Sequence, residues 1–571
     1  MQNGEDLQRL LRQIDHKGYP SYKQTAGQWQ MKGFVLSIDH VQGDPFASPS
    51  NVSVIVTGAK AAFPGEYYDA PHRQVALEDY LLRAFERELY SADTGHAGSG
   101  KSGMLATSRP GQEVLKRSAM EVNPKSGGIT ARFEVGFPAR GRTVTSESLI
   151  HIFFFLLPRI AERVFCYANV DQNRLKKAIE LADDRLALRK LLEEKKLQAF
   201  VANGSILPRE SGVSQRPMKG AVAFASPKSL EITAELPHRG TVTGMGIPEG
   251  IFLIIGGGYH GKSTLLSALE RGVYDHIAGD GREYVVTKAD AMKIRAEDGR
   301  SVKRVDVSLF INDLPSGTDT TAFSTADASG STSQAANVIE AISAGSSVLL
   351  IDEDTCATNF MVRDELMRRV VSDREESITP FLLRMRDLYE KNGVSTILVA
   401  GSSGSLFGVA DVVIQMDEYV PKDVTQQAKK EWEEEFGGNE TEPLHKFSAE
   451  FAPRCPKEIR DWKRPDARIK TKVFAIDSFS VDKETVDLRG VSQVVDREQT
   501  AAIAKLLKLL ATQYFDGKCP LEGAVERICG DLDEKGFALV EGRIIRCGLA
   551  VPRKEELIAA VNRFRRLDIR Y

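Results

Sequence analysis

The sequence predicts an α/β fold for the middle of the chain, an α+β domain before it and a mainly helical domain after it. The apolar stretch Ile251–Ile255 has the composition of a strand buried in a parallel sheet, and a glycine-rich loop follows it directly. Strand-like and helix-like segments alternate around this loop, as a mainly parallel sheet flanked by helices requires. A chain of 571 residues is also too long for one hydrophobic core. We therefore expect domains at residues 1–215, 216–425 and 426–571.

The composition is that of an ordinary water-soluble protein, with 42% hydrophobic and 27% charged residues. The formal net charge of −3 gives no overall basic signature, so any contact with nucleic acid has to come from a local patch. The six cysteines include no Cys-x-x-Cys pair, which favours reduced thiols. The apolar run Leu149–Leu157 is about half the length of a membrane helix, and the N-terminus predicts a polar helix rather than an export signal. We therefore expect a cytoplasmic protein without a membrane span.

The loop after the strand Ile251–Ile255 has the spacing of a phosphate-binding P-loop. Gly256, Gly261, Lys262 and Ser263 complete the pattern G-x-x-x-x-G-K-[ST]. In this motif, backbone N–H groups surround the phosphates, the lysine reaches the β- and γ-phosphates, and the serine hydroxyl ligates Mg²⁺. The alternative is a glycine turn between two core elements. The residues expected to hold the nucleotide are Gly256, Gly257, Gly258, Tyr259, His260, Gly261, Lys262, Ser263 and Thr264.

A second apolar strand, Val348–Ile351, leads into two acidic residues, Asp352 and Glu353. Ligands of parallel sheets bind at the carboxyl ends of the strands, where Asp352 would lie. We expect Asp352 and Ser263 to hold Mg²⁺, and Asp352, Glu353 and Lys262 to be catalytic. Glu353 is placed to polarise the water that attacks a γ-phosphate. Two surface acids at the end of a strand are the alternative.

A second match to the P-loop pattern, Gly95–Ser102, stands in a different context. A helix is expected before it and a strand after it, so we interpret it as a surface loop or as a nest for the backbone phosphate of a partner. Arg140 and Arg142, in the nearby sequence PARGR, either clamp a phosphate or belong to a solvated turn.

The sequence Ala328–Ile342 begins with S-G-x-x-x-Q and precedes the strand Val348–Ile351. This arrangement resembles the signature helix of ATP-binding cassette (ABC) ATPases. In those proteins, the signature of one subunit closes over the γ-phosphate held by the P-loop of the other. The resemblance implies a homodimer with ATP at its interface, and Ala357–Phe360 would then couple the two sites. The signature residues expected to contact ATP are Ser329, Gly330 and Ser331.

The resemblance extends over nearly the whole chain. Within the central domain, GGGYHGKSTLL, GDGRE, AEDGR, ASGSTSQAAN, DEDTCATNFM and STILVAGSSG are similar to a family of ABC-class ATPases of bacteria and some eukaryotes. Outside it, the similar segments are IDHVQGDPFASPS, GSGKSG, PGQEVLKR, PARGR, AFVANGSILPR and PRKEELIAAVNRFRRL. The family is soluble and has N- and C-terminal domains of its own, and it implies ATP and Mg²⁺ as ligands.

Two departures from ordinary cassettes concern catalysis. No glutamine occurs between Lys262 and Ser333, so the usual Mg²⁺-ligating glutamine is missing. Candidates to replace it, near the end of an expected strand Val305–Ile311, are Asp306, Ser308 and Asn312. The switch histidine expected after Ser395–Ala400 is also missing, and Gly401, Ser402 and Ser403 stand there. We select Ser402 as the hydroxyl that senses the γ-phosphate. For the adenine, Phe224 is a candidate stacking residue, with a place in the core as the alternative.

The segment Arg454–Lys472 is the strongest basic patch in the sequence. Its basic residues are Arg454, Lys457, Arg460, Lys463, Arg464, Arg468, Lys470 and Lys472, against three acids. Together with Lys101, Arg109, Arg140 and Arg142, it favours flanking domains that bind RNA or DNA phosphates in response to ATP. A solvated face is the alternative interpretation of the patch. The competing functions are the soluble motor subunit of a transporter and a nucleotide-gated interaction platform with little hydrolysis.

Overall fold

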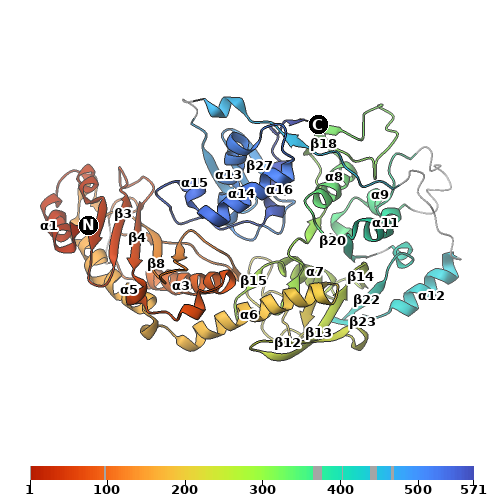
Figure 1. The fold of residues 1–571 in the computed structure, drawn as a ribbon, viewed down its shortest axis with the longest axis horizontal. Coiled ribbons are helices and arrows are strands. Elements are labelled where there is room, and N and C mark those ends of the chain that lie inside the picture. Colours follow the sequence, from red (N-terminus) through yellow and green to blue (C-terminus); the bar gives the residue numbers. More distant parts are fainter. Residues whose placement is uncertain are drawn as a thin grey trace. The chain divides into compact units, whose positions relative to one another are not determined.

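The computed structural model describes residues 2–94, 98–363, 376–401, 403–436, 447–464 and 468–570. The chain divides into two compact units, Met1–Asp183 with Lys535–Val551, and Asp184–Glu534 with Pro552–Tyr571 (Figure 1). In the first unit, the returning segment Lys535–Val551 is held by backbone bonds such as the one from Ser118 N–H to Leu549 O (2.9 Å). None of the helices in the described ranges is long and apolar enough to cross a membrane.

The first unit is built on a sheet with the strand order β1-β2-β3-β4-β8-β5, and β7 also pairs with β8. The strands are β1 Gln2–Asn3, β2 Gly27–Gln30, β3 Val35–His40, β4 Ser50–Val56, β5 Leu105–Ala106, β7 Met120–Val122 and β8 Ile129–Val135. Every second residue of β8 is buried, as a strand with one face on the core requires. Helices α1 (Gly4–Ile14), α3 (Pro71–Ser91) and α5 (Leu157–Phe165) complete this core.

The second unit contains a six-stranded sheet with the order β17-β20-β21-β14-β22-β23. Its strands are β14 Ile251–Gly256, β17 Met292–Ile294, β20 Val348–Asp352, β21 Ser395–Val399, β22 Val412–Asp417 and β23 Val420–Asp423. All the neighbouring pairs from β17 to β22 are parallel. Val399 of β21 pairs with Ile254 of β14 on one side and with Asp352 of β20 on the other. The P-loop strand and the strand that carries Asp352 therefore end at the same edge of the sheet.

Helices cover this sheet, which confirms the α/β prediction. They include α7 Lys262–Arg271, α8 Gly330–Ser343 and α11 Leu382–Asn392. Smaller sheets accompany them, with the orders β12-β13-β11-β16 and β18-β19. Their strands are β11 Leu197–Ala202, β12 Glu231–Leu236, β13 Gly240–Pro248, β16 Val285–Thr287, β18 Arg300–Val305 and β19 Phe323–Ala328.

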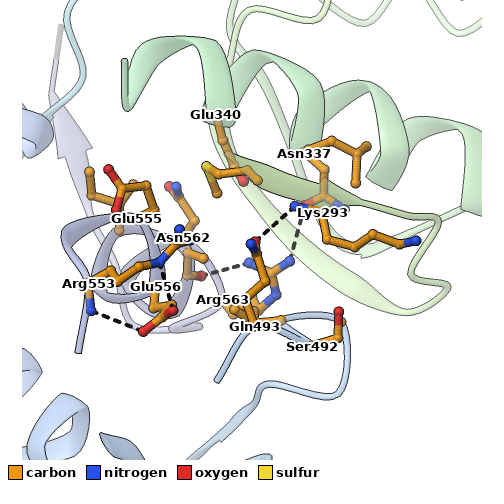
Figure 2. A pocket seen from close by; sticks show the side chains of 16 residues that line it. Lys293, Asn337, Glu340, Ser492, Gln493, Arg553, Glu555, Glu556, Asn562 and Arg563 are labelled. Carbon is orange, nitrogen blue, oxygen red and sulfur yellow. Dashed lines mark hydrogen bonds and ion pairs between the residues drawn. The ribbon is translucent and has the colours of Figure 1, made fainter. Parts of the chain in front are cut away.

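The last part of the second unit contains helices and a small sheet. The helices are α13 Arg497–Leu509, α14 Leu521–Lys535 and α16 Lys554–Asn562, and the strands are β25 Thr471–Ala475, β26 Ser478–Val481 and β27 Glu484–Asp487. Gln493 attaches this part to β17, because its side chain accepts the N–H of Lys293 (2.9 Å) and donates to Ala291 O (3.0 Å). Figure 2 shows the pocket that Gln493 lines together with Arg553 and Arg563, which flank α16. The prediction of a mainly helical C-terminal region omitted the three strands β25–β27.

Candidate nucleotide-binding site

The P-loop joins the end of β14 to the start of α7. Gly256 and Gly261 have φ angles of +139° and +98°, which side chains rarely permit. A Cβ atom on Gly256 would lie 2.4 Å from Met416 O, so the loop passes too close to β22 for any other residue there. Tyr259 also has a positive φ of 64°, and its side chain is fully exposed. The loop is therefore tightly curled, and glycine is required where it leaves the sheet.

The first helical residues after the loop carry the groups that would contact phosphate. The Lys262 ammonium lies over the loop and donates to Gly256 O (2.6 Å) and Gly257 O (2.9 Å). Ser263 follows and is exposed, and Thr264 is half-buried. The positive end of the α7 dipole and the Lys262 ammonium thus lie together at one end of the helix. This combination is suited to an anion of several negative charges.

His260 fastens the P-loop to the turn between β22 and β23. Its Nδ1 accepts the N–H of Glu418 (2.9 Å), and its carbonyl accepts the N–H of Tyr419 (3.2 Å). Since Nδ1 is an acceptor, the neutral ring carries its proton on Nε2. Glu418 and Tyr419 both have positive φ angles, which a two-residue hairpin turn needs. No local pattern in the sequence marks these two residues, because the contact joins segments far apart in the chain.

Asp352 and Glu353 lie at the carboxyl edge of the sheet. The Asp352 side chain is 8% exposed, and its Oδ1 accepts the N–H of Asp354 (3.3 Å). Burial lowers the pKa of Lys293 on the neighbouring strand, although Glu270 and Asp352 favour the charged ammonium. Burial also raises the pKa of the Cys356 thiol to about 12. Cys356 therefore stays protonated at neutral pH and is no nucleophile.

Two groups that follow β21 orient the Glu353 carboxylate. The N–H of Gly401 donates to Oε2 across 2.5 Å, and the Ser403 hydroxyl donates to Oε1 across 2.9 Å. Ser402, the serine selected from the sequence, lies outside the described residues. Ser403 is thus the hydroxyl in the described structure that occupies the place of the switch histidine. The choice of Ser402 as the sensing hydroxyl stays a prediction.

The signature sequence forms the beginning of α8. Ser329 caps this helix by accepting the N–H of Thr332, and its side chain is exposed. Ser331 is 8% exposed and donates its hydroxyl hydrogen to Asn359 Oδ1 (2.7 Å). Gln334 is fully buried and accepts the N–H of Ala357 (2.8 Å). The signature helix is therefore bonded to the segment after Asp352, and the Ser329 side chain is exposed at its beginning.

Three family models match the chain. The P-loop domain of ABC ATPases matches residues 171–453, and the N-terminal domain of ATPases of the ABC class matches residues 4–168. The chain belongs to the ABC-class ATPases. The C-terminal residues 470–570 of this ABC-class ATPase match the MRB1590 C-terminal domain. The central segment therefore has the P-loop fold of ABC ATPases, as predicted.

Two individual proteins show a more distant likeness to this ABC-class ATPase. Uncharacterized protein MJ1628 of Methanocaldococcus jannaschii is 32% identical over 247 residues, which are 41% of this chain and 53% of that protein. The chain thus spans about half the length of this curated relative. The crystal structure of MJ1267, an ATP-binding cassette of an ABC transporter in its ADP conformation, is 11% identical and covers 35% of this chain and 92% of its own. Its TM-score is 0.23, which is too low to support an inference about function.

Two expectations for this ABC-class ATPase were wrong. A strand was expected at Val305–Ile311, but the observed strand ends at Val305. The chain then turns, and this turn brings Phe310 and Ile311 into the core. Asp306 lines a cavity with Ser346 and other residues that precede β20 and β21, so it lies at the amino edge, opposite Asp352. Ser308 and Asn312 hydrogen-bond within the same turn. None of these three side chains is therefore placed to replace the missing glutamine.

The side chain of Phe224 belongs to the interior. It is 3% exposed, so neither face of the ring is open to a base. The alternative interpretation, a phenylalanine of the core, is therefore the one that the structure supports.

The second P-loop match is a junction of loops in the first unit. Residues 95–97 lie outside the described ranges. The N–H groups of Ser99 and Lys101 donate to Ala139 O and Pro45 O, both at 2.9 Å. The Ser102 hydroxyl donates to Ser99 O (2.6 Å). Backbone groups that are bonded to neighbouring loops do not surround a nucleotide, which agrees with the interpretation of this segment as a surface loop.

One residue of the basic segment has a structural role. Arg454 is 6% exposed, donates to Asn562 Oδ1 (3.0 Å) and lies 3.8 Å from a Glu340 oxygen. Its expected contact with nucleic acid was therefore wrong, because the guanidinium is buried against α8 and α16. Four other basic residues of the segment are close to carboxylates on the surface: Lys457, Arg460, Lys463 and Arg464. The remaining three, which are exposed, are Arg468, Lys470 and Lys472.

Proposed function

We propose that this protein hydrolyses ATP in a site shared by two copies of the chain, and that the nucleotide state changes how its flanking domains bind nucleic acid. The observation that carries the proposal is the carboxylate of Glu353, held by Gly401 and Ser403 at the edge of the sheet where the P-loop also ends. The domains at 1–215, 216–425 and 426–571 are our proposed functional division of the chain.

The P-loop would bind the triphosphate. Lys262 exchanges its bonds to the loop carbonyls for oxygens of the β- and γ-phosphates, and the N–H groups of the loop and of Ser263 and Thr264 donate to the phosphates. Tyr259 is fully exposed and contributes its backbone rather than a packed side chain. His260 keeps the loop in place through Glu418.

The residues at this edge fit a magnesium ion. The described residues contain no group of three or more His, Cys, Asp or Glu side chains that would form an all-protein metal site. A serine hydroxyl and one carboxylate, Ser263 and Asp352, are the sparse oxygen donors that Mg²⁺ uses when phosphates and water supply its other ligands. Bound there, Mg²⁺ would neutralise charge that develops on the phosphates.

Glu353 is the proposed general base. The Gly401 N–H bonds to one of its carboxylate oxygens and the Ser403 hydroxyl bonds to the other, and these two contacts orient the carboxylate. It would accept the proton of the water that attacks the γ-phosphate. A serine hydroxyl bears no positive charge, so the Ser403 position stabilises phosphate charge less than a protonated histidine would.

The second copy would contribute Ser329, Gly330 and Ser331. Ser329 and Gly330 stand at the positive end of the α8 dipole, and Ser329 is exposed, which favours contact with a γ-phosphate. Ser331 would act indirectly, because its hydroxyl holds Asn359.

Cations in both units, exposed except for the half-buried Lys101, support binding to RNA or DNA. In the first unit, the loop that contains Pro45, the second P-loop match and the PARGR turn contact one another through hydrogen bonds. The second P-loop match carries Lys101, and the PARGR turn carries Arg140 and Arg142. Arg142 lies 2.8 Å from Asp44, and Arg109 lies 3.5 Å from Glu86, so Lys101 and Arg140 are the stronger candidates. In the second unit, the candidates are Arg468, Lys470 and Lys472. Contacts of this kind are tolerant of sequence and sensitive to salt.

A comparison of the native protein with Glu353→Gln tests the enzymatic part. We expect the substitution to lower ATP turnover by about a hundred-fold or more and to accumulate an ATP-bound dimer. Equal phosphate release from both proteins would refute Glu353 as the base, and negligible release from the native protein would favour the interaction platform.

Gel retardation of single-stranded RNA and DNA at 50 mM salt, with and without ATP, tests the second part. No retardation of either would refute the coupling to nucleic acid, and co-purification with an integral membrane protein would favour the transporter motor.

A further inference from the structure

An arginine at the end of α16 contacts a loop that lies next to the candidate nucleotide site. Arg563 is 9% exposed and donates from Nε to Glu297 Oε2 (3.0 Å) and from Nη2 to Glu297 Oε1. Its Nη2 also donates to Asn337 Oδ1 of α8 (3.2 Å), and Figure 2 shows the two side chains facing each other. A fork that binds both oxygens of one carboxylate fixes its orientation as well as its position.

The backbone of Glu297 is bonded to the signature turn. Its N–H donates to Ser333 Oγ (2.8 Å), and Ser333 Oγ donates in turn to Gly330 O (2.8 Å). Ser333 is fully buried, so water does not compete for these bonds. One residue thus connects Arg563, through its carboxylate, with the first turn of α8, through its amide.

The same loop contacts the segment that carries the general base. It follows β17, whose parallel pairing with β20 puts both strand ends at one edge of the sheet. The N–H of Ala296 donates to Thr355 O (3.0 Å), and the Thr355 hydroxyl donates to Asp352 O (3.0 Å). A Cβ atom on Gly330 would lie 3.3 Å from Asp298 Oδ1, so the loop and the signature turn are in close contact.

The charges of this contact persist at neutral pH. Burial by itself would raise the pKa of Glu297, but the attraction of Arg563 and Arg300 lowers the pKa to about 2. Arg300 also bonds to Asn337 and Glu340 of α8. Since each charge is buried and paired, a shift of either residue would leave the other without compensation.

A second arginine holds the same turn from the surface. Arg565 is exposed and donates to Ala326 O (2.9 Å) and Gly299 O (3.1 Å). Ala326 belongs to β19, the strand that leads directly into Ser329. Arg565 therefore ties the residues before the signature to the loop that contains Glu297.

We propose that Arg563 is a positioning residue for Ser329 and Gly330, acting through Glu297, and that Arg565 supports the same turn. The C-terminal segment would thus set how well the signature half closes on the γ-phosphate bound by another copy. This inference rests on the proposed shared site. It predicts that weakening these contacts impairs closure and turnover while the P-loop of the same chain binds nucleotide normally.

The test uses the full-length variants Arg563→Gln, Arg563→Lys and Arg565→Ala. Arg565→Ala changes an exposed side chain, so its result does not depend on a disturbed core. Arg209→Gln is the matched control, because Arg209 forms a buried pair with Asp280 in the same unit and its guanidinium, within the described residues, hydrogen-bonds to Asp280. The measurements are the Kd of a fluorescent ATP analogue for dilute protein, kcat, and the ATP-dependent dimer fraction in a Glu353→Gln background.

We expect Arg563→Gln to lower kcat and the dimer fraction by about ten-fold, with Kd within about two-fold of the native value. Arg565→Ala should show a smaller effect of the same kind, Arg563→Lys should recover part of the loss, and Arg209→Gln should match the native protein. If Arg563→Gln lost nucleotide affinity and kcat together while Arg565→Ala behaved like the native protein, the result would overturn the inference in favour of a merely structural role. Unchanged turnover and dimerisation in both would also overturn it. Absence of an ATP-dependent dimer in the Glu353→Gln protein that keeps native Arg563 and Arg565 would instead refute the shared site, and this inference with it.

Discussion

The Ser403 hydroxyl donates to Glu353 Oε1 across 2.9 Å, and the two residues follow the adjacent parallel strands β21 and β20. The neighbouring Gly401 N–H donates to the other carboxylate oxygen. The loop that would carry a switch histidine in other ABC ATPases therefore orients the candidate base directly. Any movement of this loop changes where the carboxylate points, so it links the end of β21 with the chemistry at the end of β20.

The first prediction concerns this bond. Ser403→Ala removes one of the groups that orient Glu353, and we expect kcat to fall by about ten-fold, the equivalent of ~1.4 kcal/mol in the barrier. The affinity for ATP should not change, because the P-loop is untouched. Steady-state kinetics at saturating ATP measures the effect. Ser405→Ala is the control, since Ser405 lies in the following turn; equal rates for both variants would contradict an orienting role for Ser403.

The second prediction compares two glycines of the P-loop. Gly256→Ala places a Cβ atom 2.4 Å from Met416 O at a φ of +139°, whereas a Cβ atom on Gly258 meets nothing within 4 Å. We expect Gly256→Ala to destabilise the protein by about 2 kcal/mol or more and to abolish ATP binding. Gly258→Ala should cost less than about 1 kcal/mol. Urea unfolding and titration with a fluorescent nucleotide measure the two effects, and similar losses for both variants would show that the described loop path is wrong.

Whether the sequence predicts a structural feature depends on whether the residues of that feature are close together in the chain. The P-loop, Asp352 and Glu353 were found because their chemistry needs contiguous residues at fixed spacing after an apolar strand. Ser403, the turn at Glu418 and the pair of Arg563 with Glu297 depend on contacts between distant segments, and no local pattern marks them. Their positions follow from strand order and packing, which the pattern of single residues does not determine.

The same distinction explains two errors. Phe310 and Ile311 are apolar residues after a strand, and the sequence does not show that the chain turns before them. Arg454 stands in a run of basic residues, yet its partner Asn562 is 108 positions further along the chain. Charge patterns describe a surface only on average, because a single arginine in the run can be buried and bonded.

The third prediction concerns pH and the first unit. Burial raises the pKa of Glu78 to about 7, although the N–H of Val122 and the amide of Gln74 stabilise its ionised form. A raised carboxyl pKa contributes stability that is present below the unfolded value of about 4.5 and is lost as the pH rises through about 7. The loss for this group is about 3 kcal/mol. Glu78→Gln should therefore lose less stability than the native protein between pH 5 and pH 8.

Urea unfolding at both pH values checks the Glu78 prediction. The exposed Glu66→Gln variant is the control, and its pH dependence should follow that of the native protein. An identical pH dependence for Glu78→Gln and the native protein would mean that Glu78 is ionised in the folded state throughout this range.

The last prediction separates buried from exposed basic residues. Arg454→Ala removes one partner of a buried cluster and should lower the free energy of unfolding by about 3 kcal/mol, because Glu340 then loses a nearby positive charge. It should leave the salt dependence of RNA binding unchanged. Lys101→Ala and Arg140→Ala should each reduce the slope of log affinity against log salt by about 1, with little effect on unfolding. Fluorescence anisotropy with single-stranded RNA between 50 and 200 mM salt measures the slopes. A reduced slope for Arg454→Ala, with native slopes for the other two variants, would place the nucleic-acid contact in the second unit and contradict the role of the loops that carry Lys101 and Arg140.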